Sequence, residues 1–153
     1  MNVLQRMGPM TVPRTSVTPL ECRVSATDAD AAVLRRQFRA WIGAFTDDDT
    51  ADDLSLAVYE ALANVVDHAY DGRPAGSWTM NLWAIAGAPL LTGRDVVVTV
   101  TDQGSWRLGT DPGWRGRGLP MMRRLTHATS IVTGGDGTVV QLRRRVGPNL
   151  LAA

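Results

Sequence analysis

The order of apolar periodicities along the chain restricts its fold more than any other feature. Strands and helices do not alternate one for one, as they would in a parallel sheet built from β-α-β units. The patterns predict strands at 20–26, 77–87, 94–102, 129–133 and 138–146, and helices at 29–45, 54–70 and 119–128. This order predicts an α/β (α+β) domain, a two-layer sandwich with a mixed, mostly antiparallel sheet and helices on one face.

The segment 54–70 has the strongest helical pattern. Apolar residues recur on one side at a spacing of three or four, and this stripe is expected to pack on the sheet: Leu54, Val58, Ala61, Val65 and Ala69. The acidic segment 46–53 is expected to end the preceding helix and to lie before the positive end of this one.

Length and composition favour one globular domain. The chain has 153 residues, of which 44% are hydrophobic and 20% charged, with a formal net charge of +1. We expect a flexible N-terminal arm over 1–18, a domain over 19–148 and a tail over 149–153. The small net charge argues against direct binding of nucleic acid or membrane. A single cysteine and no long apolar run favour a reducing, cytoplasmic compartment.

Three polar residues recur every fourth position on the helix at 54–70. Glu60, Asn64 and His68 should therefore form a column along one side of that helix. A carboxylate and a carboxamide one turn apart can bind Mg²⁺ or a metal-bound water, and the glutamate can deprotonate a hydroxyl nucleophile. The alternative is a solvent-exposed face with incidental polar residues.

A second polar feature follows the apolar strand at 94–102. Asp102 ends that strand, and its carboxylate can accept a hydrogen bond from an exocyclic amino group such as that of adenine. Gly104, two residues later, permits close approach of a ligand to the backbone. An ordinary Asp-x-Gly turn is the alternative interpretation.

A third feature precedes the helix that begins near Leu119. Gly116, Arg117 and Gly118 would expose backbone amides and a positive charge at the start of this helix, which suits a phosphate. A flexible connection is the alternative. Thr138 opens the last strand, where its hydroxyl can face the same pocket, although a plain hairpin turn explains it equally well. In combination, the three features describe a Mg-ATP site.

These residues also resemble a known family. The segments AVYEALANVVDHAY, VTDQG, GRGLPMMRRLT and DGTVVQLRRR resemble, in order, the four motif boxes of the GHKL ATPases. More narrowly, the chain is similar to the RsbW- and SpoIIAB-type anti-sigma-factor serine kinases of bacteria. The resemblance extends from about residue 20 to 146 and implies the Bergerat ATP-binding fold.

The resemblance assigns roles to individual residues. Glu60 matches the general base and Asn64 the magnesium ligand. The residues that it places around ATP are Asn64, His68, Asp102, Gly104, Gly116, Arg117, Gly118, Leu119 and Thr138. The loop 105–115 would form a lid, and Trp106 stands where many relatives carry a second glycine.

The implied function is that of an ATP- and magnesium-dependent protein serine/threonine kinase. Such a protein holds a sigma factor away from RNA polymerase and phosphorylates an anti-anti-sigma (STAS) partner, and its relatives often dimerise through the sheet. The alternative is a nucleotide-binding module that switches protein contacts without phosphoryl transfer. A detached histidine-kinase catalytic domain is a third hypothesis, which the lack of a predicted dimerising helix with a phosphoacceptor histidine disfavours.

Overall fold

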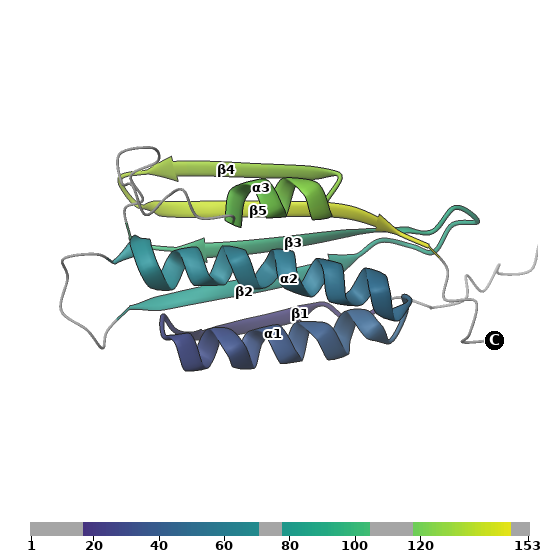
Figure 1. Ribbon diagram of the computed structural model, residues 1–153, viewed down its shortest axis with the longest axis horizontal. Helices are drawn as coiled ribbons and strands as arrows, with labels where there is room; N and C mark the ends of the chain where they lie inside the picture. The colour runs from purple at the N-terminus through teal and green to yellow at the C-terminus, as the bar shows by residue number, and fades with distance from the viewer. Residues whose placement is uncertain (1–16, 71–77, 105–117, 148–153) are drawn as a thin grey trace, which may run out of the picture.

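The computed structural model describes residues 17–70, 78–104 and 118–147 (Figure 1). Its elements in chain order are β1 (Leu20–Ser25), α1 (Asp28–Gly43), α2 (Asp48–Asn64), the π-helix η2 (Val65–Ala69), β2 (Thr79–Ala86), β3 (Arg94–Asp102), α3 (Gly118–Leu125), β4 (Ala128–Gly134) and β5 (Gly137–Val146). Most of the predicted arm 1–18, the lid 105–115 and the tail 149–153 lie outside the described residues.

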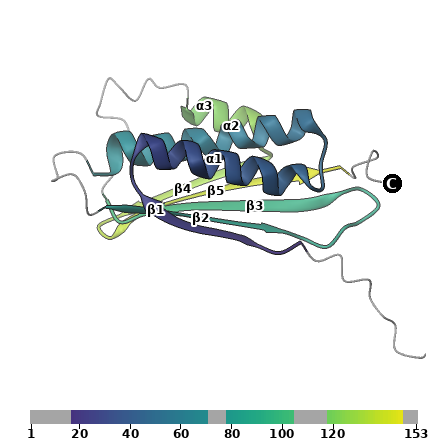
Figure 2. The ribbon, with the colours of Figure 1, turned by 90° about the horizontal axis from the view of Figure 1, so that it is seen from below.

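The sheet has five strands in the order β1-β2-β3-β5-β4, and each neighbouring pair is antiparallel. Helices α1, α2 and α3 all cover the same face of this sheet (Figure 2). The predicted two-layer α/β sandwich with helices on one face is confirmed. Within the described part of the chain, no helix combines the length and the apolar character that spanning a bilayer would require.

The core lies between α2 and the covered face of the sheet. The predicted stripe of α2 and η2 is almost fully buried, and it meets every second residue of the central strands. The buried strand residues are Met80, Leu82 and Ala84 from β2, Val96, Val98 and Val100 from β3, and Val140 and Leu142 from β5. Burial therefore alternates with a period of two along these strands, as it does where one face of a sheet is covered.

Helix α2 departs from the prediction at both ends. It begins at Asp48 rather than Leu54, because Asp47 caps it by accepting a hydrogen bond from the Thr50 amide at 2.8 Å. The hydrogen bonds from Thr50 lower the pKa of Asp47 below its usual value of 3.8. At the other end, the α-helical winding stops at Asn64 and the last five residues form the π-helix η2.

Helix α2 is the central helix of its layer. It packs against α1 on one flank and against α3 on the other (Figure 1). Its two flanks therefore contribute to two different surfaces, one shared with α1 and one shared with α3.

Candidate nucleotide site

The flank of α2 that faces α3 brings two of the predicted residues together. A Cβ added to Gly118 would lie 3.1 Å from Glu60 Oε2 and 3.4 and 3.5 Å from Asn64 Nδ2 and Oδ1. Gly118 is buried and is the first residue of α3. The absence of a side chain there lets the start of α3 lie close to the carboxylate and the carboxamide, so the predicted one-turn spacing produces a shared polar corner.

The π-helix η2 connects this corner with the end of β3. It contains the half-buried His68 and ends at Ala69, whose carbonyl oxygen would overlap any Cβ placed on Gly104. Only glycine allows that close approach of the two segments. Single π-turns within α-helices occur frequently at functional sites, and this one lies between Asn64 and the Asp102–Gly104 turn.

Asp102 is buried at the end of β3, with 6% of its surface exposed. Its Oδ1 accepts a hydrogen bond from the Gly104 amide at 2.8 Å, so the Asp-x-Gly turn proposed as the alternative is formed. The turn and a ligand role are compatible, because a carboxylate has acceptor positions for several donors. The buried carboxylate is aligned with the apolar residues Val98 and Val100 on the inner face of β3.

Thr138 lies directly across the sheet from Asp102. Its hydroxyl is buried and has no hydrogen-bond partner among the described residues, and the same holds for Asn64 Nδ2. Buried polar atoms are normally hydrogen-bonded. The Asn64 amide nitrogen is a donor and the Thr138 hydroxyl is a donor and acceptor, so both fit a polar ligand such as a nucleotide, and the carboxamide oxygen of Asn64 is of the type that Mg²⁺ binds.

The remaining predicted site residues are only partly covered. Leu119 is half-buried and packs against the core at the start of α3. Gly116 and Arg117 lie outside the described residues, as do the lid 105–115 and Trp106.

Tyr70 was not among the predicted site residues. The structure places it at the end of the sheet where Asp102 lies. Its hydroxyl donates to the Thr79 carbonyl oxygen at 2.5 Å and accepts from the Gln103 amide at 3.0 Å. Its ring stacks on Trp78 with centroids 5.0 Å apart. Tyr70 thereby holds the backbone that follows Asp102 against β2. The sequence signal that could have indicated this role is the position of Tyr70 two residues after His68, the last residue of the polar column.

The comparison with known families decides the assignment. Residues 24–144 match the histidine kinase-like ATPase domain. The chain belongs to this family. The predicted GHKL membership is thus confirmed, and it supports ATP binding by this histidine kinase-like ATPase domain.

A solved structure supports the fold, and a second, less similar one also matches part of the chain. The RsbU and RsbW domains of Rv1364c from Mycobacterium tuberculosis match with a TM-score of 0.63 and 24% identity, over 84% of this chain and 32% of that chain. The histidine kinase domain of a blue-light activated histidine kinase from Erythrobacter litoralis EL346 matches with a TM-score of 0.46 and 24% identity, over 65% and 46%. This chain therefore spans less than half the length of either match.

Proposed function

We propose that this protein is an ATP-binding anti-sigma factor that sequesters a sigma factor and phosphorylates a serine or threonine of a STAS partner. The observation that carries the proposal is the position of Glu60 and Asn64, both beside Gly118 at the start of α3. A base and a magnesium ligand at one corner suit transfer of a phosphoryl group to a hydroxyl. The likeness in fold to a chain with an RsbW domain supports the choice of partners.

The residues divide into two groups along η2. At the Gly118 corner, the Asn64 carboxamide oxygen would hold Mg²⁺, and Glu60 would accept the proton of the attacking hydroxyl. Bound Mg²⁺ supplies neutralisation of the charge that develops on the phosphates. At the other end, Asp102 would accept a hydrogen bond from the adenine amino group, with Thr138 opposite it.

The same proposal assigns the residues that lie closer to the phosphates. Backbone amides at the start of α3 would bind phosphate oxygens, because the positive end of a helix attracts anions. The residues concerned are Gly116, Arg117, Gly118 and Leu119 before and at the start of α3, and the His68 side chain from η2 would lie near the same phosphates. Gly104 would keep the adenine end narrow through its contact with Ala69.

The open face of the sheet supports a homodimer as part of this function. Trp83 is 52% exposed, and Val132 and Val139 lie opposite each other on the same face with 63% and 41% exposed. Exposed apolar side chains gathered on one face mark interaction surfaces. A second copy packed sheet to sheet would cover them and leave the helical layer accessible to partners.

The test is a phosphotransfer assay with a purified STAS protein, ATP and Mg²⁺, read out as phosphoserine or phosphothreonine. Replacing Glu60→Gln should lower transfer by about 10²- to 10⁴-fold, because general-base catalysis contributes that much. Affinity for ATP should remain unchanged, since the base is not needed for binding. Asp49→Asn, exposed in the first turn of α2 and distant along the helix from Glu60, is the control and should transfer normally.

Two outcomes would contradict the proposal. Retained transfer by the Glu60→Gln protein would remove the residue from the base role. Tight ATP binding without transfer to any STAS protein would instead favour a regulatory module that only switches protein contacts.

A further inference from the structure

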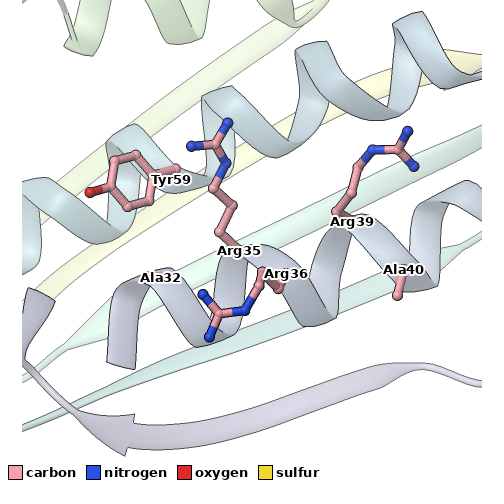
Figure 3. Close-up of a pocket in the computed structure, with 6 residues that line it drawn as sticks. All are labelled: Ala32, Arg35, Arg36, Arg39, Ala40 and Tyr59. Atoms are coloured by element: carbon pink, nitrogen blue, oxygen red, sulfur yellow. The ribbon is translucent and has the colours of Figure 1, made fainter. Parts of the chain in front are cut away.

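The opposite flank of α2 borders a groove that the nucleotide site does not use. An open cavity of about 480 Å³ lies between α1 and α2, and Figure 3 shows its walls. The residues that line it are Ala32, Arg35, Arg36, Arg39, Ala40 and Tyr59. Three of these six carry a guanidinium group, so the charge of the groove depends on how each arginine is compensated.

Arg39 is already neutralised within the protein. Its guanidinium lies 3.0 Å from Asp48 and 2.7 Å from Asp52, the acids of the first turns of α2. These hydrogen bonds raise the pKa of Arg39 above its usual value. Gly43, one turn further along α1, leaves space for this guanidinium. Arg39 therefore ties the helices together at one end of the groove and adds no net charge for a ligand.

Arg35 and Arg36 are not compensated in this way. Both are exposed, and neither forms an ion pair with any residue in the described ranges. The Arg35 guanidinium lies 5.2 Å from the centre of the Tyr59 ring, a cation–π contact that orients the side chain without reducing its charge. The groove is thus lined by two uncompensated arginines. The Arg35 guanidinium extends toward α2 and is held there by Tyr59, whereas that of Arg36 points away from α2 (Figure 3).

Three of the residues that line the groove lie on one side of α1. Ala32, Arg36 and Ala40 recur at a spacing of four along α1, so two methyl groups flank one guanidinium on the same side of the helix. The short side chains of Ala32 and Ala40 let another backbone approach closely. An open groove with methyl groups, one aromatic ring and two guanidiniums suits a segment of polypeptide better than an enclosed small molecule.

We propose that the α1–α2 groove is a docking site for an acidic segment of a partner protein. Carboxylates of that segment would pair with Arg35 and Arg36, since a guanidinium can bind a carboxylate through two parallel hydrogen bonds. An uncharged residue would follow over Ala40, where Asp48 and Asp52 border the groove and would repel further acids. Tyr59 and its ring form the wall on the α2 side.

The charges around the groove favour a protein over a nucleic acid. Nucleic-acid binding needs an extended array of cations that follows the phosphates. Here the uncompensated positive charge is confined to Arg35 and Arg36, because Asp48 and Asp52 neutralise Arg39 at the end of the groove. The groove is separated from the nucleotide site by the thickness of α2, because Tyr59 and its neighbour Glu60 face opposite flanks. The proposal therefore holds independently of phosphoryl transfer.

The test uses the full chain and a fluorescein-labelled ten-residue peptide of alternating glutamate and alanine, titrated by fluorescence anisotropy. Replacing Arg35→Gln and Arg36→Gln together should weaken binding about tenfold, because both charge-assisted contacts are lost. The matched control is Arg123→Gln with Arg124→Gln on the exposed surface of α3, which removes the same charge elsewhere. The control should weaken binding by less than about twofold.

Further measurements distinguish specific docking in the groove from nonspecific attraction between opposite net charges. Equal losses in the two double variants would overturn the proposal, because only net charge would then matter. Stronger binding of a ten-nucleotide single-stranded DNA at the same two arginines would overturn the assignment to a protein partner. Tyr59→Phe should bind the peptide as the unmodified protein does, since its ring still orients Arg35. ATP affinity of each variant, measured in parallel, should not change, so failure of the kinase proposal would be seen separately.

Discussion

The two ends of the β3–β5 pair have similar backbones and different chemistry. At each end a glycine has a positive φ, 108° at Gly93 and 136° at Gly137. A Cβ on Gly93 would overlap the Val146 carbonyl oxygen, and one on Gly137 would overlap that of Asp102. Both ends therefore use a glycine to pass the chain close beside a strand terminus.

The side chains at these two ends differ. Opposite each other at one end stand Asp102 and Thr138, both buried. At the other end Arg94 is paired with the buried Val146 and places its guanidinium 5.1 Å from the Phe45 ring. The proposed function makes the Asp102 end the ligand end. The Arg94 end contacts the aromatic ring of Phe45 and is expected to serve stability.

The largest expected effect tests this difference with two aspartates of the same strand. Asp102→Ala should weaken ATP binding about 100-fold and remove the preference for adenine over guanine, because a buried hydrogen-bonding group discriminates strongly. Asp95→Ala, near the Arg94 end, removes an exposed carboxylate paired with Arg145 at 3.2 Å and should leave both properties unchanged. Calorimetric titration with ATP and GTP measures them. An unaltered preference in the Asp102→Ala protein would exclude this residue from the site.

Much of this architecture followed from periodicity in the sequence. The apolar run 94–102 predicted a strand that ends at Asp102, and the helical stripe through Leu54 and Val58 predicted the buried side of α2. Such patterns are reliable because each element must bury one face. The spacing of Glu60 and Asn64 fixed their common side in the same way, since α2 remains α-helical up to Asn64.

The remaining features depend on contacts between distant segments. Helix α2 begins early because Asp47 caps it. This start was missed because the acidic residues of 46–53 are equally common in loops. The switch from α-helical to π-helical winding after Asn64 could not be predicted, because a segment of five residues is too short to show a change in the spacing of its apolar residues. Tyr70 gained its role only when β2 and the Gln103 amide were brought to its hydroxyl. The arginine groove likewise required two helices in register.

The next expected effect compares the two positive-φ glycines. Gly137→Ala and Gly93→Ala should each lower the free energy of unfolding by about 2 kcal/mol, the usual cost of a strained backbone conformation. Only Gly137→Ala should also weaken ATP binding, because it displaces the Asp102 carbonyl beside the proposed adenine position. Urea unfolding and ATP titration separate the two quantities. Equal losses of ATP affinity would show that the two ends do not differ in function.

The smallest expected effect concerns the helix caps, which act on stability alone. Asp47→Ala removes the α2 cap and should cost about 1 kcal/mol at neutral pH. The native pKa of Asp47 is lowered, so its stabilising effect is complete above the unfolded value of 3.8 and disappears as the pH falls through the lower native pKa. The deficit of Asp47→Ala relative to the unmodified protein should therefore shrink in acid.

Thr27→Ala is the matched control for this cap. The Thr27 hydroxyl caps α1 by accepting from the Asp30 amide at 3.1 Å, and it does not titrate in this range. Its removal should cost a similar free energy at every pH, whereas the cost of Asp47→Ala should decline between neutral pH and about pH 3. Denaturant unfolding at both pH values measures the two differences. If the cost of Asp47→Ala stays constant with pH, the α2 cap acts through its shape and not through its charge. A loss of ATP affinity in the Asp47→Ala protein would contradict the division of the sheet into a ligand end and a stability end.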